Sequence, residues 1–257
     1  MPANERVAIV TGSATGVGAA TARLFASKGW RIVVNYTKSE AEARDTEAAC
    51  RAAGTETLLV RGDVADDADC RRLAAAALNA WGRIDALVNN AGVTRFADHR
   101  DLEALQAQDF QRVYAVNVVG AYQMIRACAP AMKRQGKGAV VNVSSIAGVT
   151  GMGSSVAYAA SKAALNSITV TLARALGPEI RVNAVCPGLI EGRWLREGLG
   201  EKVYDALRER YRSNTPLQRT AQPEDVAESI AWLIEGAQLV TGELLLLDSG
   251  MHIAVPR

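Results

Sequence analysis

The chain has 257 residues, of which 49% are hydrophobic and 22% are charged, and its formal net charge is +2. This balance is typical of a globular protein with one large core, and it requires neither a nucleic-acid partner nor a membrane partner, because no apolar run approaches the ~18 residues that span a bilayer. The four cysteines are scattered without a C-x-x-C pair, which favours reduced thiols in a cytoplasmic protein over a disulfide framework or a metal site; they are Cys50, Cys70, Cys128 and Cys186.

A glycine-rich segment follows the first predicted strand, residues 7–10. It reads Thr11-Gly12-Ser13-Ala14-Thr15-Gly16-Val17-Gly18 and leads into a helical pattern over 19–28. Glycines let a backbone approach a pyrophosphate closely, and a helix N-terminus offers free N–H groups and a positive dipole end. The segment predicts a dinucleotide site, with an ordinary tight turn as the alternative. The candidate cofactor contacts are Gly12, Ser13, Thr15, Gly16, Val17 and Gly18.

The end of the second predicted strand, residues 31–35, indicates which nicotinamide cofactor the chain prefers. An NAD-specific fold usually places Asp or Glu there for the ribose 2′-hydroxyl, whereas a 2′-phosphate requires a cation or hydroxyls. The residues that follow the strand are not acidic; they are Tyr36, Thr37, Lys38 and Ser39. We therefore predict NADP(H), with NAD(H) as the alternative because Glu40 is nearby. The alternative without a cofactor role is that Lys38 is a solvated charge and that Ser39 and Glu42 form a helix capping box.

Two further strands are predicted over 57–60 and 85–88, and each runs into polar residues. The first reaches Asp63, whose carboxylate either accepts from an adenine amino group or caps the helix that begins near Asp66. The second reaches Asn89-Asn90-Ala91-Gly92, where small and amide residues can pack beneath a cofactor, although this is also common turn chemistry. The candidate cofactor contacts in these two segments are Asp63, Val64, Asn90, Ala91 and Gly92.

The stretch 102–133 has a strongly helical pattern, and one polar residue, Asn117, is embedded in an apolar run there. A buried amide costs stability unless it is hydrogen-bonded, so Asn117 needs partners. It either binds a carbonyl or a water beside Lys162, or it is an amide at a helix bend that ties strands together. Pro130 is expected to end or kink this helix late.

Ser145, Tyr158 and Lys162 are the main candidates for catalysis. Ser145 lies just past an apolar run over 139–143 that predicts a buried strand, and ligands bind at the carboxyl ends of such strands. Tyr158 and Lys162 are four residues apart, so they share one face of the helix that we predict to end at Leu176. A phenol titrates near pH ~10, and the ammonium is expected to bring its pKa closer to neutral. Alone, such a pair is also common in helices without a catalytic role.

The last part of the chain contains a strand, a charged segment, and a final helix and strand. The strand predicted over 180–185 runs into Cys186-Pro187-Gly188-Leu189-Ile190 at the ligand edge of the sheet. From 191 to 215 the pattern is charged and amphipathic, as expected for a substrate lid or, alternatively, for a surface helix pair. A helix over 223–234 and a strand over 242–248 follow. The candidate cofactor contacts here are Pro187, Gly188 and Ile190.

Seven motifs in this order resemble the classical short-chain dehydrogenase/reductase family over roughly residues 5–250. They are TGSATGVG (11–18), Asp63-Val64, NNAG (89–92), Asn117, VNVSS (141–145), YAASK (158–162) and PG (187–188). The resemblance implies a single α/β domain over 1–257 with a Rossmann-type doubly wound fold, a seven-stranded parallel sheet and helices on both faces. It also implies a homo-oligomer, most often a tetramer, and a catalytic tetrad of Asn117, Ser145, Tyr158 and Lys162, in which Tyr158 and Lys162 also contact the cofactor.

Within this family, the NNAGVTR run and the segment 35–39 look most like 3-oxoacyl-[acyl-carrier-protein] reductases and related ketoreductases. The resemblance implies NADP(H)-dependent hydride transfer between the nicotinamide and a small ketone or secondary alcohol, with an acyl thioester among the candidate substrates. Two departures are Gly192, where family members commonly carry a threonine, and FADHRDLEALQAQ (96–108), which replaces a methionine-rich stretch.

Three alternative functions are weighed against this one. The first is an NAD-dependent secondary-alcohol or sugar dehydrogenase of the same family. The second is a non-catalytic NADP-binding sensor, which an incomplete tetrad would favour. The third is a hydrolase that uses Ser145, which the missing G-x-S-x-G elbow disfavours. The two histidines, His99 and His252, lie in a polar loop and near the C-terminus, so neither is expected to act as a general base or a metal ligand.

Overall fold

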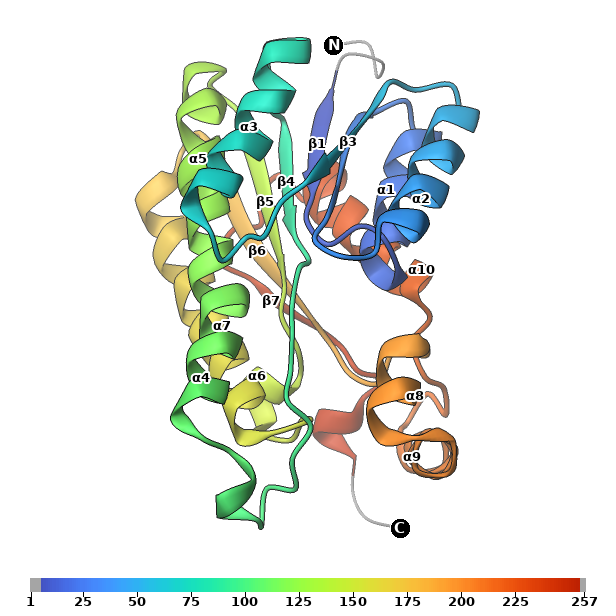
Figure 1. The fold of residues 1–257 in the computed structure, drawn as a ribbon. Helices are drawn as coiled ribbons and strands as arrows, with labels where there is room; N and C mark the ends of the chain where they lie inside the picture. Colours follow the sequence, from blue (N-terminus) through green and yellow to red (C-terminus); the bar gives the residue numbers. More distant parts are fainter. Residues whose placement is uncertain (1–5, 255–257) are drawn as a thin grey trace.

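The computed structural model describes residues 6–254, which fold around one parallel sheet (Figure 1). The sheet has seven strands in the order β3-β2-β1-β4-β5-β6-β7, and every neighbouring pair is parallel. The strands are β1 (Val7–Val10), β2 (Arg31–Tyr36), β3 (Thr57–Arg61), β4 (Ala86–Asn89), β5 (Gly138–Val143), β6 (Ile180–Pro187) and β7 (Leu244–Leu247). The strand order reverses direction between β1 and β4, as in doubly wound folds, so the predicted fold class is confirmed.

Helices cover both faces of the sheet, because parallel strands are joined by crossover helices (Figure 1). One face carries α1 (Gly16–Ser27), α2 (Glu40–Ala52) and α10 (Pro223–Ala231), and the other carries α3 (Asp67–Trp81), α5 (Ala121–Arg134) and α7 (Val156–Leu176). The remaining helices are α4 (Ala107–Tyr114), α6 (Ala147–Thr150), α8 (Arg193–Leu199) and α9 (Glu201–Asn214). Short 3₁₀ and π segments are η2 (Leu102–Ala104), η3 (Ala115–Gly120), η4 (Trp232–Gly236) and η5 (Met251–Ile253).

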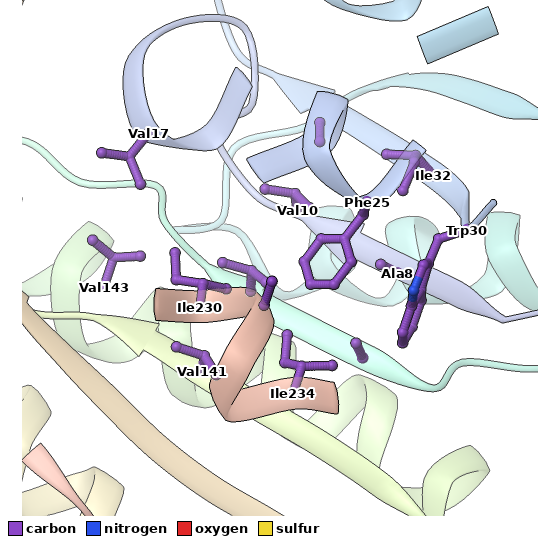
Figure 2. Packing of buried hydrophobic residues seen from close by; sticks show 14 of the residues in the cluster. Ala8, Val10, Val17, Phe25, Trp30, Ile32, Val141, Val143, Ile230 and Ile234 are labelled. Carbon is purple, nitrogen blue, oxygen red and sulfur yellow. The ribbon is translucent and has the colours of Figure 1, made fainter. Parts of the chain in front are cut away.

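The core on the α1 and α10 face is built around Phe25 and Trp30 (Figure 2). Phe25 is fully buried, and its ring lies edge-on to that of Trp30, with 5.0 Å between the ring centroids. Val10 and Ile32 reach this cluster from the sheet, and Ile230 reaches it from α10. Each apolar strand therefore contributes side chains to two cores, one on each face of the sheet, since alternate side chains point to opposite faces.

The long helix predicted over 102–133 is interrupted in the structure. It is divided into η2, α4, η3 and α5, and the π segment η3 carries Asn117. A π turn holds one more residue than an α turn, which reorients the side chains within it, and such turns occur frequently at functional sites. Pro130 does not end the helix, because α5 continues through it to Arg134.

Three further observations concern the helices, the possible metal ligands and the cysteines of residues 6–254. None of the helices in this range is both long and apolar enough to cross a membrane. The same range contains no cluster of three or more His, Cys, Asp or Glu side chains placed to hold a metal ion. The four cysteines are buried thiols, and burial raises the pKa of Cys70 and of Cys128 to about 12, which keeps both protonated at neutral pH.

Candidate active site

The four predicted tetrad residues meet at the carboxyl edge of the sheet. Ser145 follows the end of β5, Tyr158 and Lys162 lie on α7, and Asn117 lies on η3. A Cβ atom built on Gly92 would lie 3.5 Å from Asn117 Oδ1 and 3.7 Å from Lys162 Nζ, so both groups border this glycine. The fold therefore brings together side chains that are as far as 45 residues apart in the chain, from Asn117 to Lys162.

Lys162 is buried beneath the site, with 4% of its surface exposed. Its ammonium donates a hydrogen bond to the carbonyl oxygen of Val143, 2.8 Å away, and lies 5.5 Å from the centre of the Tyr158 ring. Burial lowers the pKa of Lys162 to about 8, because the charged form loses hydration. Lys162 is thus positioned by the end of β5 while its Nζ stays close to the Tyr158 ring.

Tyr158 is a protonated phenol at neutral pH. Burial raises the pKa of Tyr158 to about 12, and the neighbouring Ser145 hydroxyl offsets this only in part. Our expectation that Lys162 brings this pKa closer to neutral is not met by the protein groups alone, since burial raises the pKa and Ser145, rather than Lys162, is the group that lowers it. The raised pKa instead makes Tyr158 a group that holds its proton until a partner accepts it.

Asn117 has hydrogen-bond partners on two other segments of the chain. Its Oδ1 accepts from the backbone N–H of Val93 at 2.8 Å, and its Nδ2 donates to Val93 O and to Ser161 Oγ, each at 3.0 Å. The amide ties the loop after β4 to α7, rather than tying strands to each other. Its buried polar atoms are satisfied, which explains how an amide is tolerated in an apolar stretch.

We expect the contribution of Lys162 to the free energy of unfolding to rise with pH between about pH 8 and pH 10, while the buried cysteines, whose pKa values are raised, contribute in the opposite direction. The folded chain loses the Lys162 proton near pH 8, whereas the unfolded chain keeps it up to the ordinary value of 10.5, so the unfolded state binds more protons at this group in this window. The full difference corresponds to roughly 3 kcal/mol, present as a penalty at neutral pH. Urea unfolding at about pH 7.5 and pH 9.5 measures it.

The matched variant is Lys162→Met, which keeps an unbranched side chain without the titrating group. It should unfold at a higher urea concentration than the wild type at about pH 7.5, because no charge is buried, and the difference in stability between the two proteins should shrink by about pH 9.5. Parallel pH profiles of the two proteins would contradict the assignment of this pH dependence to Lys162.

The glycine-rich segment forms the turn that was predicted between β1 and α1. Gly12 has a φ of +60° and Gly16 a φ of +57°, conformations that favour glycine. A Cβ atom on Gly18 would lie 2.4 Å from Asn90 Nδ2, so only glycine lets the turn pack this closely on the loop after β4. Thr15 is the residue before α1, and within the described residues its side chain makes no capping hydrogen bond. The first-turn N–H groups of α1 can therefore bind an anion.

Several predicted cofactor contacts point into the protein instead of toward the sheet edge. The Ser13 hydroxyl donates to Val10 O at 2.7 Å, and Val17 is buried in the core beneath α1. The Asn90 amide donates to Thr11 O and Gly12 O, both at 2.9 Å. These side chains shape the turn, so a bound cofactor would meet their backbone more readily than their side chains.

The end of β2, which is predicted to select the cofactor, has charged side chains from β3 and α2 beside it. Arg61, at the end of β3, is the Cα partner of Tyr36 in the sheet. The guanidinium of Arg44, 2.6 Å from Glu40 Oε1, lowers the pKa of Glu40, with smaller effects from the Tyr36 hydroxyl and from Arg61. The negative charge of Glu40 is therefore balanced by that of Arg44, while Lys38 is exposed.

Two local alternatives at helix starts are decided by the hydrogen bonds. Ser39 precedes α2 but, in the part of the chain that the structure describes, its side chain makes no capping bond, and Glu42 pairs with Arg193 at 2.9 Å, so the capping box is wrong. Asp66, not Asp63, caps α3 by accepting from Ala68 N. Asp63 accepts from Ala65 N at 3.0 Å and pairs with Arg112.

The segment after β6 forms a helix pair, α8 and α9, that extends along the carboxyl edge of the sheet (Figure 1). Its base is held by Glu191, whose Oε1 accepts from Arg212 at 2.7 Å, and by a bridge between Ile190 and Ala221. Gly188 is required beside Tyr211, because a Cβ atom there would lie 2.0 Å from the Tyr211 hydroxyl oxygen. Pro187 accepts a hydrogen bond from Ile146 N at 2.9 Å.

Three residues that sequence reasoning missed complete the site. Asn35 Oδ1 accepts from Gly12 N at 3.0 Å, which braces the glycine turn. Phe96 and Trp194 form an aromatic contact next to Tyr158, with ring-centroid distances of 5.8 Å for Phe96–Trp194 and 5.9 Å for Tyr158–Trp194. For Phe96 and Trp194, the only signal in the sequence is an aromatic residue in an otherwise polar segment, and that pattern does not predict that the two rings meet.

Comparison with known proteins agrees with this geometry. Residues 12–252 match a family model described as Enoyl-(Acyl carrier protein) reductase. A relative named "Granaticin polyketide synthase putative ketoacyl reductase 2", from Streptomyces violaceoruber, is 43% identical over 247 residues, which are 96% of either chain. The solved "putative short-chain dehydrogenase/reductase from Burkholderia xenovorans" has a TM-score of 0.90 at 40% identity, over 96% of this chain and 98% of its own.

A second solved structure, that of an NAD⁺-bound xylitol dehydrogenase, has a TM-score of 0.88 at 30% identity, over 97% of this chain and all of its own (100%). The matches extend over nearly the whole chain, and they include the sheet edge where the four tetrad residues meet. The chain belongs to the short-chain dehydrogenase/reductase family.

Proposed function

We propose that this chain is an NADP(H)-dependent carbonyl reductase that transfers hydride between the nicotinamide and a ketone or secondary alcohol. The observation that carries the proposal is the arrangement of Tyr158, whose phenol lies beside the Ser145 hydroxyl and whose ring centre is 5.5 Å from the buried ammonium of Lys162. In the reductive direction, a protonated phenol at this position can donate its proton to the carbonyl oxygen. The ketoacyl reductase relative supports a carbonyl substrate, and an acyl thioester is one candidate.

Each tetrad residue has a role that its surroundings support. Tyr158 would donate a hydrogen bond and then its proton to the substrate oxygen, while the Ser145 hydroxyl would hold the same oxygen in place. Donors aimed at a developing alkoxide commonly contribute about 3 to 4 kcal/mol each to the lowering of the barrier. Lys162 would stabilise the phenolate that Tyr158 leaves behind and would bind the nicotinamide ribose. Asn117, whose side-chain amide binds Val93 and Ser161, would hold the loop after β4 in place beside Lys162.

The residues present fit a nicotinamide dinucleotide. The first-turn N–H groups of α1 and the positive end of its dipole suit a pyrophosphate, and the left-handed Gly12 and Gly16 keep the turn narrow. Gly92 borders Asn117 and Lys162, so a nicotinamide ribose could approach the ammonium there without meeting a side chain. When bound, the cofactor supplies or accepts the hydride.

Lys38 is proposed to select NADP(H) by pairing with the 2′-phosphate, aided by Arg61. We expect Lys38→Ala to weaken NADPH binding about tenfold and to leave NADH binding unchanged, because a hydrogen bond to a charged group is lost. Calorimetric titration with each cofactor measures this. Lys133→Ala, an exposed lysine in the last turn of α5, is the matched control and should change neither affinity. An equal loss for both cofactors would contradict this role of Lys38.

The second candidate function is an NAD-dependent dehydrogenase of secondary alcohols or sugars. Two observations favour it: Glu40 lies near the Tyr36 hydroxyl, which contributes to lowering the pKa of its carboxyl, and a structural relative is an NAD⁺-bound xylitol dehydrogenase. The same titrations distinguish the two functions, because tighter binding of NADH than of NADPH by the wild type would favour this second candidate.

We also propose that the protein is a cytoplasmic homotetramer. Buried thiols suit a reducing compartment, and the outer surfaces of α5 and α7 expose Tyr122 by 43% and Val170 by 39%. Light scattering of the purified protein would report the number of subunits.

A further inference from the structure

Three aromatic rings lie together at the catalytic tyrosine. The Trp194 ring, on α8, is 5.9 Å from the Tyr158 ring and 5.8 Å from the Phe96 ring, and the planes are tilted by 51° and 55°. Aromatic residues make up only 5% of the chain, and only three of them are phenylalanines. Such a concentration at one place, contributed by three separate segments, points to a binding surface.

The segments that carry the rings are held against one another. The loop with Phe96 is pinned to the turn before α7 by a Thr94–Ser154 hydroxyl contact of 2.7 Å and by the Ala97 N–H, which donates to Ser154 O at 2.9 Å. Helix α8 approaches the loop closely at Gly198, where a Cβ atom would lie 2.0 Å from a carbon of the Phe96 ring. The aromatic cluster is therefore a fixed surface rather than a chance contact of mobile side chains.

The cluster is open to a ligand. Trp194 keeps 47% of its surface exposed although it contacts both other rings. On its other side, the Tyr158 ring is bordered by Gly153, where a Cβ atom would lie 3.3 Å from Tyr158 Cδ1. An accessible indole beside the group that donates the proton is positioned to contact the substituent next to a substrate carbonyl.

We infer that Trp194 and Phe96 determine the substrate class, and that they select ketones whose carbonyl carries an aryl or fused-ring substituent. This inference rests on the proposed carbonyl reductase function and deepens it. Tilted rings leave faces against which a planar group packs in the offset or edge-on geometries that aromatic pairs prefer. The cluster offers such a group apolar faces, and the hydroxyls of Thr94 and Ser154, on the segments that hold Phe96, already contact each other.

The test compares two ketones that differ in one group, ethyl benzoylacetate with its phenyl ring and ethyl acetoacetate with a methyl group. The wild type is expected to have a kcat/KM at least about tenfold higher for the phenyl compound. In Trp194→Ala this value should fall about tenfold or more, mainly through KM, while kcat/KM for ethyl acetoacetate should change less than about threefold. Trp194→Phe should restore most of the preference, and the NADPH dissociation constant should stay unchanged throughout.

Trp232→Ala is the matched control, because Trp232 is 51% exposed and lies on η4. It should alter neither substrate. An equal loss with both ketones in Trp194→Ala would overturn the inference, since Trp194 would then only hold α8 in place. A wild type that reduces ethyl acetoacetate as well as the phenyl compound would overturn it too. A wild type that binds NADPH yet oxidises it with no ketone would refute the proposed function itself.

Discussion

Replacing Tyr158 by phenylalanine is expected to lower kcat for ketone reduction by about a hundredfold to ten-thousandfold, the range for losing a positioned general acid. The ring would still fill its place beside Trp194, so only the hydroxyl and its proton are lost. NADPH affinity should change less than about threefold, because the glycine turn and the first turn of α1 are untouched. Single-turnover kinetics with excess enzyme, followed at the NADPH absorbance, would measure the chemical step.

The control for this variant is Tyr122→Phe, which removes a hydroxyl from an exposed tyrosine on α5. It should have wild-type rates. Wild-type turnover by the Tyr158→Phe variant would end the proposal that this phenol is the proton donor. Loss of NADPH binding together with turnover would instead assign Tyr158 to the cofactor site alone.

Phe25→Ala is expected to destabilise the protein by about 3 to 5 kcal/mol, the largest effect that we expect for a core substitution. Phe25 is fully buried between α1, α10 and the sheet, and its ring contacts Trp30 edge-on (Figure 2). The truncation leaves a cavity that these rigid elements cannot close, so the lost contacts are not replaced. Urea unfolding gives the free-energy change, and the melting temperature should fall by roughly 10 °C.

Phe25→Leu serves as the comparison, because it keeps most of the apolar volume and should cost about 1 kcal/mol. The Tyr158 site lies at the carboxyl edge of the sheet, so both Phe25 variants should keep wild-type kcat while folded. A loss below 1 kcal/mol in Phe25→Ala would show that the α1 and α10 core can repack, contrary to our expectation.

The sequence was sufficient for the fold, and the reason lies in the strands. Central strands of a parallel sheet are buried on both faces, so β1, β5 and β6 stand out as short apolar runs bounded by glycine, polar or proline residues. The helix predicted to end at Leu176 ends there, since Gly177 and Pro178 stop it. The strand expected over 85–88 is observed at Ala86–Asn89, a shift within the ordinary uncertainty of element ends.

The predicted helix over 102–133 was accurate only in part. A helical pattern does not distinguish α from π turns, because both place apolar residues on one side. The π segment η3 instead follows from the partners of Asn117, Val93 and Ser161, which come from a distant loop and from another helix. Similarly, Ser39 and Glu42 do not form the capping box, because Glu42 pairs with Arg193, which lies 151 residues away in the chain.

The sequence by itself determined the family, the fold class and the chain positions of the tetrad, because these depend on local apolar periodicity and on short motifs whose order survives in the linear chain. Only the tertiary structure decided that Lys162 is buried against Val143 O, that the pKa of Tyr158 is raised to about 12, and that Phe96 and Trp194 meet beside it. Burial and side-chain contacts depend on residues that are distant in the sequence, so a pattern of neighbouring residues does not predict them.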